Sequence, residues 1–184
     1  MSCRVAIANA IAVVMGCALG AGPAVAADDG CARAAAVADD ATLQQAVDSV
    51  LCLVNEERAE RGLPPVHASR LLRRSAQAHS RDMVARRYFS HVTPGGKGVR
   101  KRVVHTGYVR RRRAFKVGET IAWGTNQLGT PAQLVSSFMS SPTHRDILLD
   151  GSFRDVGIGL VLDAPVAGAP GAGATLTLDF GRRG

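Results

Sequence analysis

The sequence has few aromatic residues and lacks several familiar catalytic patterns. Phenylalanine, tyrosine and tryptophan make up 4% of its 184 residues, too few for the aromatic platforms that bind single-stranded nucleic acid. Gly-x-Ser-x-Gly, His-Glu-x-x-His, Cys-x-x-Cys and a glycine-rich phosphate loop are all missing. These absences argue against a serine-hydrolase elbow, a zincin helix and a redox-active dithiol. Histidines and carboxylates are left as the side chains that could carry chemistry.

Long apolar runs are also scarce, and the one present lies at the N-terminus. It extends from Val5 to Leu19 after Arg4, and small residues follow at Ala24 and Ala26. The run is too short to span a bilayer comfortably and is typical of a secretory signal peptide. We predict a signal peptide at 1–26, an N-terminal arm at 27–41 and one domain at 42–184, secreted and without a transmembrane segment after cleavage. Lipidation at Cys17 is the alternative.

Cysteine is limited to four residues, of which Cys3 and Cys17 fall within the predicted signal peptide. Cys31 and Cys52 remain as an even pair in an oxidising compartment, where disulfides form and persist. We therefore predict a Cys31–Cys52 disulfide that attaches the arm to the first helix. Two free thiols are the alternative.

Acidic residues are outnumbered, so the formal net charge is +8. The basic residues concentrate at 100–102 and in a patch made of Arg110, Arg111, Arg112 and Arg113. Outside the cell such a patch would meet anionic lipid headgroups or cell-wall polymers. Nucleic acid is not an expected partner of an exported chain. A solvated basic loop that aids solubility is the alternative.

The first helix is predicted from sequence signals at both of its ends. Thr42 and Gln45 form a capping box, apolar residues recur behind it at helical spacing, and Gly62 ends the helix. The charged residues 56–61 are expected on its solvated face.

Further helices are predicted at 69–87, from 99 to Gly107, and at 130–140, the last behind a second capping box at Thr130 and Gln133. Residues 115–123 are expected to lead into a loop. Strands are predicted at 156–162 and 174–180, with a loop at 164–173 between them. Helices followed by strands indicate an α+β fold, an α-β-α sandwich with an antiparallel sheet between helices.

Three polar residues are candidates for one site. His91 falls in a loop, Glu119 in a short apolar segment, and His144 behind a corner made by residues 140–142. Two imidazoles and a carboxylate can hold zinc or another divalent metal with an open position. Without metal, a histidine supported by a carboxylate can act as a general base on water. A hydrogen-bonded polar cluster lining a groove is the third interpretation. His79 is predicted to be a hydrogen-bonded structural histidine.

Six stretches resemble the CAP superfamily (cysteine-rich secretory proteins, antigen 5 and pathogenesis-related proteins), in its short bacterial branch. They occur in the family's order, and they are Leu53-Val54-Asn55-Glu56-Glu57-Arg58 with Gly62-Leu63, Ala78-His79-Ser80 with Asp82-Met83, Tyr88-Phe89-Ser90-His91, Gly118-Glu119 with Ile121-Ala122, Ser141-Pro142 with His144-Arg145, and Phe153 with Val156-Gly157-Ile158-Gly159. The resemblance implies an α-β-α sandwich. It also implies a cleft with two histidines and two acidic residues, which binds metal in some members.

His91, Glu119 and His144 match three of those four positions, and the fourth lacks a carboxylate near Ser141. Phe138 also stands where tryptophan is usual, and Thr120 where asparagine is usual. The missing carboxylate argues against tight zinc binding and against an inherited hydrolytic activity.

The expected function is that of a secreted, monomeric, non-enzymatic module that binds an anionic or amphiphilic ligand or surface, such as anionic lipid or a cell-wall polymer. The alternative is a metal-assisted hydrolase with His91 and His144 as ligands and Glu119 as third ligand or base. A third interpretation is a wall-associated factor that acts through protein contacts. Family members have been linked to lipid or sterol binding, to proteolysis and to signalling, so the resemblance specifies the fold more closely than the function.

Overall fold

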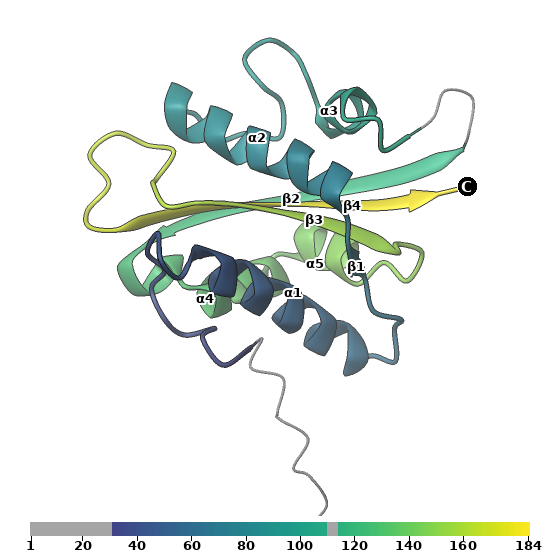
Figure 1. Ribbon diagram of the computed structural model, residues 1–184, viewed down its shortest axis with the longest axis horizontal. Helices are drawn as coiled ribbons and strands as arrows, with labels where there is room; N and C mark the ends of the chain where they lie inside the picture. Colours follow the sequence, from purple (N-terminus) through teal and green to yellow (C-terminus); the bar gives the residue numbers. More distant parts are fainter. Residues whose placement is uncertain (1–30, 110–113) are drawn as a thin grey trace, which may run out of the picture.

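A central sheet lies between two layers of helices in the computed structural model, which describes residues 31–109 and 114–184 (Figure 1). Helices α1 (Leu43–Ala59), α4 (Pro131–Ser140) and α5 (Pro142–Leu148) cover one face of the sheet. Helices α2 (Arg70–Arg86) and α3 (Val99–His105) cover the other face. The predicted α-β-α sandwich is confirmed.

The sheet has the strand order β1-β3-β4-β2, with β1 at His67–Ala68, β2 at Phe115–Thr125, β3 at Asp155–Val161 and β4 at Gly173–Arg183. The long strands pair antiparallel, as predicted, whereas the two residues of β1 pair parallel with the start of β3. In the described chain no strand lies beside the outer edge of β3 beyond Val156.

Strand β2 is the element that the sequence analysis missed, because residues 115–123 were expected to lead into a loop. The strand pairs with β4 along its whole length and continues into the 3-10 helix η2 (Asn126–Gly129). Gly118, Gly124 and the charged Glu119 weaken the local strand signal. Hydrogen bonding to β4 stabilises the strand although its own residues favour a strand only weakly. The pairing also places Glu119 directly opposite Asp179.

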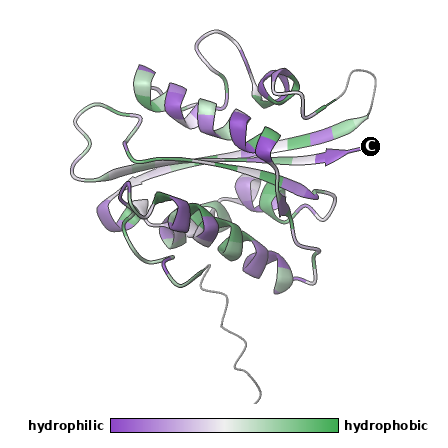
Figure 2. Ribbon diagram, in the orientation of Figure 1, coloured by the Kyte–Doolittle hydropathy of each residue, from purple (hydrophilic) through white to green (hydrophobic). Residues whose placement is uncertain are grey.

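The main hydrophobic core lies between the sheet and the layer of α1, α4 and α5. Its buried residues include Val50, Val54, Leu134, Phe138, Leu148, Phe153, Leu176, Leu178 and Phe180. The α2–α3 side has a smaller apolar cluster around Leu72, Val103 and Tyr108. Hydrophilic and hydrophobic residues alternate along the helices (Figure 2), as expected for helices that bury one face.

Helix α2 packs against β3 at very short range. A Cβ atom at Gly157 would collide with the backbone of Leu72, and one at Gly159 with the backbone of Ala76. The two glycines therefore allow helix and strand backbones to approach directly. Ser80 strengthens this contact by donating a hydrogen bond to the Gly159 carbonyl at 2.8 Å.

The two capping predictions have different outcomes. Thr130 accepts a hydrogen bond from the Gln133 N–H at 3.4 Å and caps α4 as predicted. The Thr42 side chain does not cap α1, so that prediction is wrong. Its hydroxyl instead donates to the Asp39 carboxylate at 2.6 Å and accepts from the Asp39 N–H at 2.9 Å. The hydroxyl therefore stabilises a local turn before the helix rather than the helix end.

Arg58 also departs from its prediction, because it is fully buried rather than on a solvated face. Its guanidinium donates to the carbonyls of Pro64 at 3.0 Å, Leu148 at 2.7 Å and Asp150 at 3.2 Å. The side chain thus joins α1 to the loop that follows it and to the end of α5. A cation is favourable there because the carboxyl end of a helix carries partial negative charge.

Cys31 and Cys52 form the predicted disulfide, with their Cα atoms 5.5 Å apart. The bridge closes a loop over a sequence separation of 21 residues and joins the segment before α1 to that helix. A cross-link of this span stabilises a fold by about 3 kcal/mol.

Some predictions concern residues outside the described ranges. They are the signal peptide at 1–26 with its alternative anchor at Cys17, and the basic patch at 110–113. In the portion of the chain that is described, no helix has both the length and the apolar character that crossing a bilayer requires.

Candidate functional site

The three predicted site residues come from three elements on the β2 side of the sheet. His91 lies in the loop between α2 and α3, Glu119 lies within β2, and His144 lies in the first turn of α5. Side chains along β2 point alternately to the two faces of the sheet. Glu119 and Val117 point into the α2–α3 layer, whereas Gly118 between them faces the main core at Phe153 and Ile147. The corner between α4 and α5 presents His144 from the opposite layer.

His91 and Glu119 are directly bonded. Nδ1 of His91 lies 2.8 Å from Oε1 of Glu119, and the imidazole is 49% exposed whereas the carboxylate is 2% exposed. The carboxylate can therefore orient the imidazole while the rest of the ring faces solvent. The general-base interpretation of His91 depends on such a contact between imidazole and carboxylate.

Arg102 makes the second bond to this carboxylate. Its Nη2 atom donates to Oε2 of Glu119, and its Nη1 atom donates to the carbonyls of His91 and Lys97, both at 2.9 Å. Its side chain is only 9% exposed, although the basic run at 100–102 predicts contact with anionic ligands or solvent. Arg102 therefore neutralises Glu119 and fixes the loop that carries His91.

The pKa of Glu119 is lowered in these surroundings. Burial by itself raises it, but the His91 hydrogen bond and the charges of Arg102 and His79 outweigh that effect. The carboxylate is therefore ionised at neutral pH and acts as an acceptor for its two bonded neighbours.

His144 joins this site through ring contacts. Its imidazole meets the His91 ring edge-on at a centroid distance of 5.9 Å and the Phe138 ring at 5.5 Å. Burial, followed by the neighbouring charge of His91, lowers the pKa of His144. The three predicted residues are therefore brought together, with one direct hydrogen bond between His91 and Glu119.

His79 lies behind the predicted site and is buried in α2, as expected for a structural histidine. Its Nε2 atom lies 2.9 Å from the Ser90 carbonyl and 3.9 Å from Oε2 of Glu119. Burial lowers the pKa of His79 more strongly than the nearby Glu119 raises it. His79 therefore supports the loop before His91 from within the protein.

Asp179 is a buried neighbour of Glu119 that sequence reasoning missed. It is fully buried, and neither carboxylate oxygen has a hydrogen-bond partner among residues 31–109 and 114–184. Burial and the charge of Glu119 raise the pKa of Asp179 well above its ordinary value. A neutral Asp179 next to an ionised Glu119 avoids two adjacent negative charges in the interior.

The arrangement does not fit a bound divalent metal. Both Glu119 oxygens are engaged, one by a cation, and the corner at Ser141 supplies no carboxylate. The described residues contain one close group of three metal-binding types, Cys31, Cys52 and Glu56, and its two sulfurs are joined in the disulfide. His91 could reach a metal through Nε2 while Nδ1 stays bonded to Glu119, but Glu119 could serve as a third ligand only by giving up one of its present partners. We therefore derive no chemical step through a metal.

The family is established by the sequence itself. Residues 51–168 match CAP, the Cysteine-rich secretory protein family, and this match covers more than half of the chain. The chain therefore belongs to the CAP family, as its motifs indicated. It is also 34% identical over 113 residues to the uncharacterized protein YkwD of Bacillus subtilis, covering 61% of this chain and 41% of that relative. It thus spans less than half the length of YkwD.

Solved structures show the same fold. An extracellular protein with an SCP domain from Bacillus anthracis aligns with a TM-score of 0.60 at 22% identity, over 78% of this chain and 44% of that one. An outer surface protein from Borrelia burgdorferi aligns with a TM-score of 0.61 at 14% identity, over 80% of this chain and 97% of that one. Both neighbours are described as extracellular or outer-surface proteins.

Proposed function

We propose that the protein is a secreted binding module that attaches to anionic, amphiphilic surfaces through α3 and the loop before it. The observation that carries this proposal is that exposed cations and exposed apolar side chains occur together in the segments around His91. Lys97, Arg100 and Lys101 are exposed, and within the described residues none of them forms an ion pair. Arg102, in contrast, is directed inward onto Glu119.

The exposed apolar residues of the same segments are Phe89, Val92 and Val104. Because Arg102 bonds the His91 carbonyl, the loop and α3 are held together as one unit. Cations near an anionic membrane surface contribute about 1 kcal/mol each, and apolar side chains add to binding by entering the interface. Further along the sequence, the predicted basic patch Arg110–Arg113 lies outside the described residues and is not part of this proposal.

Sedimentation with lipid vesicles tests the proposal. The native protein should sediment with vesicles of phosphatidylglycerol and phosphatidylcholine but not with phosphatidylcholine alone, and high salt should release it. Lys97→Glu/Lys101→Glu should weaken binding. Arg145→Glu/Arg182→Glu changes the net charge equally at exposed positions elsewhere and should bind more strongly than that variant. Equal loss in both variants would show a response to net charge only and contradict the proposed surface.

A soluble anionic polymer distinguishes lipid from wall material. Polyglycerol phosphate carries the same phosphodiester charge without an acyl chain. If it competes fully with the vesicles, the headgroup charge suffices. If it does not compete, the apolar residues Phe89, Val92 and Val104 contribute to binding.

A further inference from the structure

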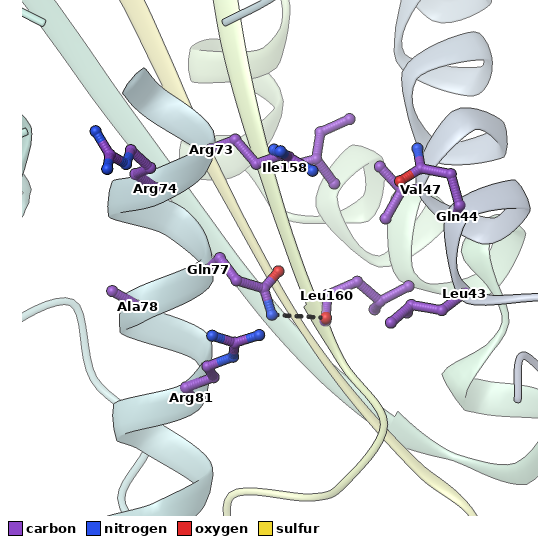
Figure 3. A pocket seen from close by; sticks show the side chains of 10 residues that line it. All are labelled: Leu43, Gln44, Val47, Arg73, Arg74, Gln77, Ala78, Arg81, Ile158 and Leu160. Carbon is purple, nitrogen blue, oxygen red and sulfur yellow. Dashed lines mark hydrogen bonds between the residues drawn. The ribbon is translucent and has the colours of Figure 1, made fainter. Parts of the chain in front are cut away.

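An open groove runs along the outer edge of β3, at the edge of the sheet that lies away from β2. Figure 3 shows Ile158 and Leu160 of β3 between α2 on one side and α1 on the other. Two neighbouring cavities of about 390 and 320 Å³ lie here and share Gln44, Val47, Arg73 and Ile158 in their linings. The shared lining makes them parts of one groove.

The floor of the groove offers backbone hydrogen-bonding groups. The Val156 carbonyl points outward and accepts from the Ser69 N–H at 2.7 Å, and the Leu160 carbonyl accepts from the Gln77 amide at 3.1 Å. Alternate residues of a strand direct their N–H and C=O groups to the same side. Those of Ile158 must therefore also point into the groove. Gln77 occupies the place that a donor of a neighbouring strand would take, so a strand added here would bond first to Ile158 and would replace Gln77 at Leu160.

The two walls of the groove differ in chemistry. Leu43, Val47 and Leu51 recur every four residues on α1 and form an apolar, partly buried wall. On α2 the wall carries the exposed residues Arg73 and Arg81, and Arg70 lines the adjoining cavity. None of these three arginines forms an ion pair within the described ranges.

We propose that this groove binds an extended peptide segment of alternating acidic and apolar residues, which adds to the outer edge of β3 as a further strand. In an added strand successive side chains would point alternately to the two faces of the sheet. One set would meet the apolar wall on α1, and the other set would meet the arginines on α2. Strand β1 already uses the same edge for its two residues.

The spacing of the arginines agrees with this occupant. Arg73 and Arg81 are eight residues apart on α2, which corresponds to about 12 Å along a helix. Residues i and i+4 of a strand lie about 13 Å apart on one face. A single acyl chain would present one charged end to one arginine and would leave the Ile158 backbone groups without a partner, so the peptide fits more features of the groove.

Fluorescence anisotropy with a labelled hexapeptide, acetyl-Val-Glu-Val-Glu-Val-Glu, tests this inference on the chain from residue 27 onward. We expect saturable binding that weakens about tenfold or more in Arg73→Glu/Arg81→Glu. The charge-matched Arg145→Glu/Arg182→Glu should retain most of the affinity. The isomer Val-Val-Val-Glu-Glu-Glu should bind at least about tenfold more weakly, because only alternation addresses both walls.

Hydrogen exchange at the Ile158 amide provides a readout specific to strand addition. Saturating peptide should slow exchange at Ile158 and leave exchange within β2 unchanged. Equal affinity for the two isomers, or an unprotected Ile158 amide, would overturn the proposal. Binding of dodecanoate in the groove without binding of the peptide would assign it to an acyl chain and would also overturn the proposal. The surface differs from that around α3, so either proposal can fail alone.

Discussion

Charged side chains have opposite surroundings at the two edges of the sheet. On the β2 side the Glu119 carboxylate is buried and bonded to His91 and Arg102, so its charge is compensated inside the protein. On the β3 side Arg73 and Arg81 are exposed beside an open strand edge, with no ion-pair partner in the described chain. A compensated charge maintains the fold, whereas an uncompensated charge beside free backbone groups is available to a ligand.

Removing the Arg102 cation should have the largest effect on the stability of the fold. Arg102→Met leaves the Glu119 carboxylate buried with one oxygen unpaired, which should cost about 3–5 kcal/mol of unfolding free energy. Urea denaturation would measure this. The double variant Arg102→Met/Glu119→Gln should recover a large part of the loss, since the buried charge is then gone. Without such recovery, Arg102 would stabilise the fold through packing rather than through charge.

Asp179→Asn should have a smaller effect of opposite sign. The pKa of Asp179 is raised in the folded state from 3.8, so the unfolded chain loses the proton above about pH 4 while the folded protein keeps it. This residue therefore reduces stability as pH rises toward neutrality. The asparagine variant should be more stable at pH 7 by on the order of 1 kcal/mol.

Denaturation of native and variant protein at pH 4 and pH 7 would check this sign. The advantage of Asp179→Asn should grow with pH. A constant difference between native and variant protein would contradict a neutral, buried Asp179.

Arg73→Glu/Arg81→Glu should change stability least, by about 0.5 kcal/mol or less, because exposed side chains without partners contribute little. The same substitutions should strongly affect peptide binding, and this separation of effects sharpens the contrast with Arg102. A large loss of stability, seen as a lower urea midpoint, would mean that the arginines have a structural role.

Zinc calorimetry tests whether the site formed by His91, Glu119 and His144 binds metal. We expect no binding in the micromolar range to the native protein, because both Glu119 oxygens are engaged. Tight binding that disappears in His144→Ala would instead favour the metal-assisted hydrolase and would justify a substrate screen.

Local signals in the sequence predicted much of the fold. Apolar spacing, glycine stops and the Thr130 cap located helices α1 to α4, and the alternation of Leu176, Leu178 and Phe180 located β4. Cys31 and Cys52 could be paired because few alternatives existed. In each case the deciding interaction lies nearby in sequence or the choice is small.

The missed features depend on partners distant in the sequence. Arg58 is buried because its partners include carbonyls near residue 148, and β2 forms because β4 pairs with it. For the candidate site, the motifs predicted His91, Glu119 and His144. The inward direction of Arg102 and the burial of Asp179 follow only from the packing of α2 and α3 over the sheet.

The direct contact of α2 with Gly157 and Gly159 has a mechanical consequence for the groove. With backbone against backbone, no side chain lies between helix and strand that could change rotamer and alter their separation. The floor and the arginine wall are therefore held at a constant distance, and a ligand does not have to order them. The loss of backbone entropy on binding then falls on the incoming segment, and the protein loses mainly the side-chain freedom of Arg73 and Arg81. A ligand already held in an extended shape should therefore gain the most affinity.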